Sequence, residues 1–180
     1  TAKEVVVKRS ANTKFFENED GTGQYIVSSA PIHYKNANNQ FEDIDTTIQP
    51  ASGEADFAME KSIYKVKFKK SFAANKMVHV EKDGAGFTTT FGNLFWTNKL
   101  ESEQIISIPQ DVQGGISGNQ ISYLGAYGTG LNLSYESNDV SLAKKLTVPS
   151  LESLTVPNEE IVAGEETRLA LGTEFELDKD

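Results

Sequence analysis

Cysteine is absent from this sequence of 180 residues, which excludes a disulfide framework, a zinc–thiolate site and a cysteine nucleophile. Histidine occurs only twice, at His33 and His79, and two are too few for a metal site built from several histidines. No apolar run approaches the roughly 18 residues of a membrane-spanning helix, so we expect no membrane insertion. Neither a glycine-rich phosphate loop nor an EF-hand loop is present, and we expect no cofactor and no metal.

Basic residues are outnumbered, because 17 Lys and Arg against 26 Asp and Glu give a net charge of −9. This balance argues against a nucleic-acid binder, which needs a broad positive surface. The excess is concentrated: residues 151–180 hold nine acidic and two basic residues, whereas residues 1–150 hold 17 and 15. Such a shift in composition often marks a boundary. We therefore predict a domain over residues 1–150, followed by an acidic arm or extra strands over residues 151–180.

Helical periodicity is almost absent as well, and apolar residues instead alternate with polar ones. Tyr64, Val66 and Phe68 alternate with lysines, as in a strand with one buried and one wet face. Many such runs are separated by Gly, Asn and Asp clusters that suit tight turns. The pattern predicts an all-β fold, an antiparallel β-sandwich or a barrel-like form, with a C-terminal extended arm. A short helical turn is expected within residues 51–60.

Three blocks of sequence, in order along the chain, carry a resemblance to a known family. They are Asn12-Thr13-Lys14 followed by Pro31-Ile32-His33-Tyr34-Lys35, then Phe41-Glu42-Asp43-Ile44-Asp45, and then residues 118–123, 130–135 and 143–148. Together they resemble the β-rich N-terminal module of Rhs-type and wall-associated bacterial surface proteins, a module similar to those of some bacteriophage structural proteins. The resemblance spans roughly residues 5–150. Phe41 stands where the family has tryptophan, and Leu131-Asn132-Leu133 replaces a valine-aspartate-leucine stretch.

The resemblance implies a scaffold role and carries over no catalytic residue. Surface members of the family normally have a signal peptide before this module, whereas the sequence here begins Thr1-Ala2-Lys3 with no apolar signal segment. This favours the phage-like branch. We therefore expect a non-enzymatic structural or assembly protein of a bacteriophage virion, associated with the capsid or tail and made in the host cytoplasm. Its partners would be further copies of itself or other virion or surface proteins.

An aromatic cluster offers an alternative function. Phe95 and Trp96 follow Phe91 around a Gly-Asn pair. They suit a core, but in an exposed loop they would suit stacking on a sugar or anchoring an interface. The alternative is therefore a cell-surface or secreted carbohydrate-binding, adhesin-like module whose ligand is a glycan.

Lysines form the one concentration of positive charge, a stripe made of Lys65, Lys67, Lys69 and Lys70. On an edge strand, such a stripe commonly blocks unwanted sheet pairing. The functional alternative is contact with an acidic surface, such as the tail of a neighbouring subunit.

Within the acidic tail, Leu169, Leu171, Phe175 and Leu177 keep a period of two. This spacing predicts strands, and a strand lent to a neighbouring chain would bury these side chains and satisfy its backbone by edge pairing. We interpret the tail as the place where a partner or a second copy attaches.

The remaining candidates for chemistry have structural alternatives. Asp43 and Asp45 lie two apart on a predicted strand, and one face with two carboxylates would suit glycoside hydrolysis or a cation. The structural alternative is a hairpin in which Asp45 accepts hydrogen bonds from turn amides before Thr46 and Thr47. We expect His33 to make a structural hydrogen bond and His79 to lie on a wet strand face.

Overall fold

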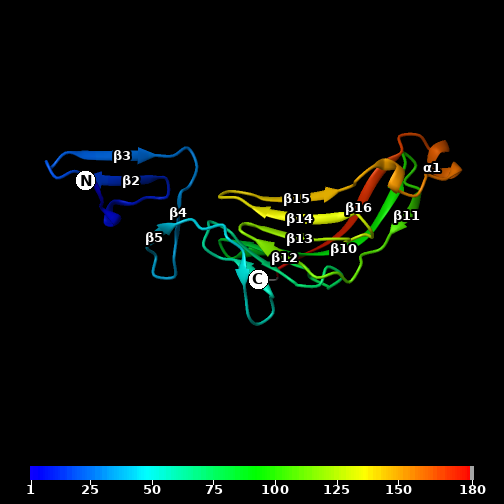
Figure 1. The fold of residues 1–180 in the computed structure, drawn as a ribbon, viewed down its shortest axis with the longest axis horizontal. Coiled ribbons are helices and arrows are strands. Elements are labelled where there is room, and N and C mark those ends of the chain that lie inside the picture. Colours follow the sequence, from blue (N-terminus) through cyan, green and yellow to red (C-terminus); the bar gives the residue numbers. More distant parts are fainter. Residues whose placement is uncertain (179–180) are drawn as a thin grey trace.

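The structure, a computed structural model, describes residues 1–178 and is nearly all-β, as the alternating pattern predicts (Figure 1). Its strands are β1 (Lys3–Glu4), β2 (Thr13–Glu17), β3 (Gly23–Val27), β4 (His33–Lys35), β5 (Phe41–Asp43), β6 (Gln49–Pro50), β7 (Phe57–Met59), β8 (Lys65–Phe68), β9 (Val78–Lys82), β10 (Ala85–Thr97), β11 (Glu103–Ser107), β12 (Gly115–Ser117), β13 (Gln120–Tyr123), β14 (Asn132–Ser137), β15 (Leu142–Thr147) and β16 (Arg168–Leu177). The helices are short: the 3-10 turns η1 (Val6–Lys8) and η2 (Leu151–Ser153), and the α-helix α1 (Glu159–Ala163).

Two antiparallel sheets form the body of the molecule. The larger sheet has the order β11-β10-β9-β8-β7-β6, with β16 also paired to β10, and the smaller sheet has the order β12-β13-β14-β15. Both sheets contribute side chains to one buried apolar cluster, in which the ring centroid of Tyr135 on β14 lies 6.4 Å from that of Phe91 on β10. The body is therefore a β-sandwich, and neither sheet closes into a barrel within residues 1–178.

The long strand β10 organises the larger sheet. Along one side it pairs with β16 from Phe87 to Thr97; on the other, β9 pairs with its first half and β11 with its second. Alternate residues along β10 turn inward: Thr89, Phe91, Leu94 and Trp96 are buried. A β-bulge between Phe91 and Leu94 adds one residue to β10 and shifts its register with β16.

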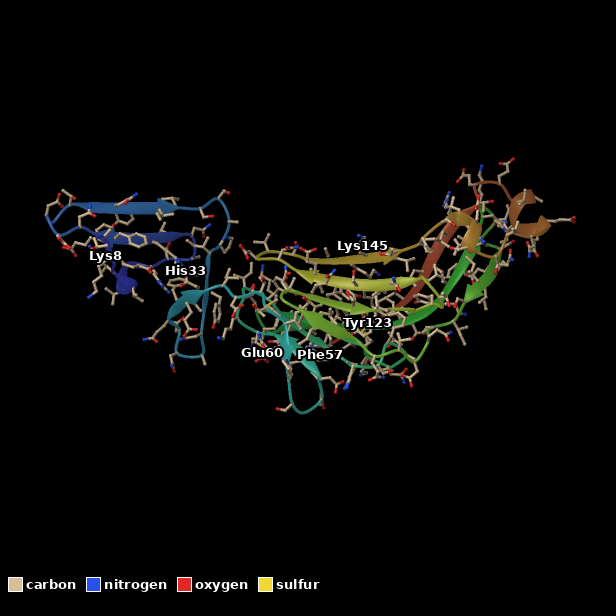
Figure 2. All side chains as sticks on the ribbon, in the orientation of Figure 1. Lys8, His33, Phe57, Glu60, Tyr123 and Lys145 are labelled. Atoms are coloured by element: carbon tan, nitrogen blue, oxygen red, sulfur yellow. The ribbon has the colours of Figure 1, made fainter. Side chains whose placement is uncertain are left out.

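Aromatic side chains fill the space between the two sheets. The Phe72 ring lies at the centre of this core, with its centroid 5.1 Å from that of Phe91, 5.4 Å from Tyr123 and 5.3 Å from Tyr127. Tyr123, labelled inside the sandwich in Figure 2, donates its hydroxyl to the Lys69 carbonyl at 2.7 Å. The polar end of a buried tyrosine needs such a partner, and burial raises the pKa of Tyr123.

A smaller unit lies at one end of the molecule (Figure 1). It consists of the sheet β1-β2-β3 and the hairpin β4–β5, whose strands pair only with each other in the described part of the chain. Phe15 and His33 are its buried side chains. A three-stranded sheet that buries so little has marginal stability by itself. The chain leaves this unit and enters the sandwich at Ile48, which is 2% exposed.

The C-terminal segment belongs to the sandwich. Leu154 and Ile161 join the same buried cluster as the side chains of both sheets, so the core continues past residue 150. Of the two forms expected for residues 151–180, an arm or extra strands, the structure shows an extra strand, β16. Helix α1 was not predicted; it begins where the Asn158 side chain accepts a hydrogen bond from the Ile161 amide at 2.9 Å.

The expectation of a helical turn within residues 51–60 is wrong. Phe57–Met59 form β7 instead, and Ala58 and Met59 are buried. The side chains of this strand pack into the core, and this packing outweighs the weak local helical preference.

Candidate functional site: the open edges of the sheets

The edge strands of the sheets differ in how they are protected against pairing with another chain. Strand β6 is two residues long and ends in Pro50, whereas β15 carries Lys144 and Lys145, and Lys145 lies on this outer strand in Figure 2. Short length, proline and lysine all discourage edge pairing. Strand β11 is covered by the C-terminal segment, because Gln104 donates to the Val156 carbonyl at 3.2 Å and accepts from the Asn158 amide at 2.7 Å.

Strand β16 lacks these protections. It is ten residues long and, within residues 1–178, pairs only with β10; its sequence contains neither lysine nor proline. Its side chains at Phe175 and Leu177 are 66% and 74% exposed. Leu169 and Leu171 are half-buried against the core. The tail residues singled out from the sequence therefore form one open edge.

The hydrogen bonding of β16 shows which backbone groups remain free. The Asp178 amide donates to the Gly86 carbonyl at 2.9 Å, so the backbone groups of the even-numbered residues point toward β10. In an antiparallel pair the direction alternates from one residue to the next. The amides and carbonyls of Leu169, Leu171, Thr173, Phe175 and Leu177 consequently point away from the sheet. The residues with free backbone groups are also those that carry the apolar side chains.

Two buried side chains of β10 and its following turn hold the segment that leads into β16. The Trp96 indole nitrogen donates to the Thr155 carbonyl at 2.6 Å. The Asn98 side-chain amide donates to the carbonyls of Glu160 and Ile161 at 3.2 and 3.3 Å. These bonds fix residues 155–161 against the sandwich, and the strand that follows runs back along β10.

Ionic contacts fix the other end of β16. On its polar face, Glu176 accepts from the Lys76 ammonium at 2.9 Å, and Asp178 lies 2.8 Å from Nε2 of His79. Gly86 makes room for the second contact, because a Cβ at that position would collide with Oδ2 of Asp178. Part of the acidic charge of the tail is therefore paired with groups of the same chain.

The lysine stripe does not lie on an edge strand, so the edge-blocking interpretation is corrected. Strand β8, which carries Lys65 and Lys67, lies between β7 and β9. Lys67 and Lys69 line a recess of about 550 Å³ together with Lys76, His79 and Asp178. Lys70 is exposed beyond the end of β8. The structure thus brings the stripe close to the acidic end of β16 in the same molecule.

The expectation that Trp96 could stack on a sugar from an exposed loop is also corrected. Trp96 is 9% exposed and belongs to the core cluster. Phe95 points to the opposite face of β10, where it lies half-buried between Ile105 and Ala170 of the neighbouring strands. The two aromatic side chains face opposite sides of one strand and form no common platform. Alternation along β10 separates them.

A second open edge, β3, was not singled out in the sequence. All five of its residues are exposed, and Tyr25, Ile26 and Val27 are 60%, 46% and 73% exposed. The ring of Tyr25 covers Phe15, with centroids 4.6 Å apart. The available signal was a run of five uncharged residues, Gly23–Val27, without lysine or proline.

Asp43 holds the N-terminal unit together. It accepts a hydrogen bond from Nη2 of Arg9 at 3.1 Å, pairs with the ammonium of Lys14 and lies 3.5 Å from Nε2 of His33. Arg9 also binds both carboxylate oxygens of Glu4, at 2.7 and 2.9 Å. The hydrogen bond from Lys14 is the main cause that holds the pKa of Asp43 below its ordinary value. This network joins the three-stranded sheet to the hairpin β4–β5.

The two remaining predictions about polar residues agree with the structure. Asp45 accepts a hydrogen bond from the Thr47 amide at 3.0 Å, which is the turn proposed as the structural alternative. The buried ring of His33 makes a hydrogen bond of 2.6 Å between Nδ1 and the Ser10 carbonyl, and its role is structural as expected. The two carboxylates considered for glycoside hydrolysis are thus engaged in separate structural contacts.

Within residues 1–178, no group of three or more His, Cys, Asp or Glu side chains is placed to hold a metal ion. In the same part of the chain, no helix has the length and apolar character needed to cross a membrane. Comparisons with protein-family models, curated proteins and solved structures find no match.

Proposed function

We propose that this protein is a non-enzymatic structural subunit that works by packing against other protein subunits through its open sheet edges. The observation that carries the proposal is the pair of unprotected edges, β3 and β16, which expose both backbone groups and apolar side chains. Unpaired edges of this kind are templates for pairing with another chain. A protein that works as a monomer would be less prone to aggregate if these two edges were covered or blocked.

The distribution of the two edges supports an assembly role. Strand β3 belongs to the unit at one end of the molecule, whereas β16 belongs to the sandwich (Figure 1). Two separate edges allow one subunit to contact two others. The small N-terminal unit gains most from such contact, because a partner strand on β3 would add to the few buried side chains it has.

The finer identity rests on the sequence resemblance. We propose a bacteriophage virion component, associated with the capsid or the tail, whose partners are other copies of itself or other virion proteins. The alternative of a cell-surface, glycan-binding module loses the residue on which it was based, because Trp96 is buried. Asp43, the catalytic candidate of a hydrolase, is bound to Arg9 and Lys14.

The proposal is tested by sedimentation velocity of the full chain over a wide range of concentration. We expect self-association that is reduced by Val27→Lys on β3 or by Phe175→Lys on β16, and most strongly by both together. The matched control is Val162→Lys, which places the same charge on an exposed valine of α1 away from both edges. A monomer at every concentration, with no binding to other proteins of the same particle, contradicts the proposal.

A further inference from the structure

We propose that β16 pairs with β16 of a second copy, antiparallel about a twofold axis through Thr173, so that the larger sheets of two molecules become one continuous sheet. This inference rests on the proposed assembly function and specifies the partner, the strand and the register. It concerns an edge of ten residues, Arg168–Leu177, that binds only β10 within the described chain.

The free backbone groups restrict the register. The outward-pointing amides and carbonyls belong to odd-numbered residues, as the bond between the Asp178 amide and the Gly86 carbonyl establishes. Two such strands can form hydrogen-bonded pairs only when an odd-numbered residue lies opposite an odd-numbered residue. Every permitted register therefore places the face of β16 that carries the apolar side chains next to the same face of β16 in the second copy.

Among these registers, the one centred on Thr173 matches the side chains best. Leu171 of each copy then lies opposite Phe175 of the other, and Leu169 lies opposite Leu177. All four apolar residues gain an apolar neighbour across the strands, and such cross-strand pairs stabilise a sheet. Moving the axis to Gly172 leaves Leu177 without one of these four residues opposite it. Moving the axis to Glu174 does the same to Leu169.

The exposure of these side chains fits the same arrangement. Phe175 and Leu177 are largely exposed, whereas Leu169 and Leu171 are already partly covered by the core. The proposed register sets the exposed end of each strand against the partly covered end of the other. The association would therefore cover the apolar surface that the single molecule leaves in water.

The charges on the polar face are compatible with this register. Arg168 of one copy lies opposite Asp178 of the other, and this pair occurs twice. Glu174 lies opposite Gly172, and Glu176 lies opposite Ala170, so no carboxylate directly opposes another. Like charges directly opposite each other destabilise a sheet, and the register avoids them. The lysines of β15, Lys144 and Lys145, disfavour the same kind of pairing by the smaller sheet, because lysine on an edge strand discourages pairing with another chain.

Disulfide crosslinking tests the register, since the chain has no cysteine of its own. Thr173→Cys places one thiol of each copy at the axis, where hydrogen-bonded partners have Cα atoms about 5.5 Å apart, within the range that a disulfide spans. We expect mild oxidation to yield a covalent dimer. Val162→Cys, on the exposed face of α1, reports crosslinking by random collision. Dimer yields that are equal for the two variants overturn the register.

A mixing experiment provides a second measurement. Leu171→Cys and Phe175→Cys should crosslink when the two proteins are mixed, whereas each alone should give only the collisional yield. In sedimentation, Phe175→Lys should raise the dissociation constant at least about tenfold, equivalent to about 1.4 kcal/mol. Val162→Lys should leave it unchanged. Crosslinking of either cysteine variant alone, at the level of the mixture, contradicts the antiparallel register.

The results separate this inference from the proposed function. Self-association that Val27→Lys abolishes and Phe175→Lys leaves intact would overturn β16 pairing while supporting assembly through β3. Self-association that neither substitution affects would overturn both. Association lost only in Phe175→Lys, with crosslinking through Thr173→Cys, supports the inference in full.

Discussion

Replacing Trp96 by alanine should destabilise the whole sandwich, because this residue serves the core and anchors the segment that leads to β16. Its side chain is 9% exposed, and its indole nitrogen donates to the Thr155 carbonyl at 2.6 Å. The matched substitution Trp96→Phe keeps most of the buried ring and removes only the donor. The pair of variants separates packing from hydrogen bonding.

The expected magnitudes follow from these two contributions. Removing a large aromatic side chain from a core costs about 3–5 kcal/mol. Loss of the hydrogen bond, which leaves the Thr155 carbonyl without its partner, costs about 1–2 kcal/mol. Trp96→Phe should therefore lose about 1–2 kcal/mol, and Trp96→Ala about 4–7 kcal/mol. The larger loss is a considerable fraction of the about 5–15 kcal/mol that stabilises a typical protein.

Urea unfolding followed by far-UV circular dichroism measures both losses, since Trp96 is the only tryptophan and its fluorescence disappears with the substitution. With an m value of about 2 kcal/mol/M, the midpoint should fall by about 2 M or more in Trp96→Ala. A midpoint equal to that of the unchanged protein would refute the placement of this ring in the core. It would also restore Trp96 as a candidate for contact with a glycan.

Three further predictions concern the N-terminal unit and the end of β16. The pKa of Asp43 is lowered in the folded state, chiefly by the hydrogen bond from Lys14. The Asp43 carboxylate therefore stabilises the fold fully above the pKa that it has in the unfolded chain, and this stabilisation is lost as the pH falls through its pKa in the folded chain. Amide NMR signals of β2 should therefore change in acid at a higher pH than those of β10, and simultaneous loss would contradict this. Asp43→Asn should produce the same selective change near neutral pH, whereas a uniform effect on both strands would argue against the network. Gly86→Ala should lower the free energy of unfolding by about 1–3 kcal/mol, because the new Cβ would collide with Asp178 and a backbone carbonyl. The control is Gly115→Ala, where the new Cβ meets open space. Equal melting temperatures for the two variants would refute the crowding at Gly86.

Much of the fold could be predicted from the alternation of side chains. The run that contains Val66 and Phe68 is a strand with both residues buried, and the tail that contains Leu169 and Phe175 is a strand as well. Alternation reports which side chains share a face, and this is a local property of the chain. It therefore identified strands even in the acidic tail, where composition favoured an extended arm.

The order of the strands could not be predicted in this way. Whether β8 lies at an edge or inside a sheet depends on pairing between distant segments, and the lysines of its wet face suit either position. The burial of Trp96 depends on residues 151–161 folding back over β10, which no pattern within β10 reveals. The open edge at β3 went unnoticed for the same reason: an edge is a property of the sheet, and the sequence of one strand does not record its neighbours.

Amide hydrogen exchange at β16, measured by NMR as a function of protein concentration, tests the central claim most directly. In the single molecule, the amides of the odd-numbered residues, such as Leu171 and Phe175, point away from β10 and should exchange quickly. On concentration, these amides should become protected, while the amides of Glu174 and Glu176, already bonded to β10, should change little. Odd-numbered amides of β16 that exchange equally fast at every concentration would contradict assembly through this edge.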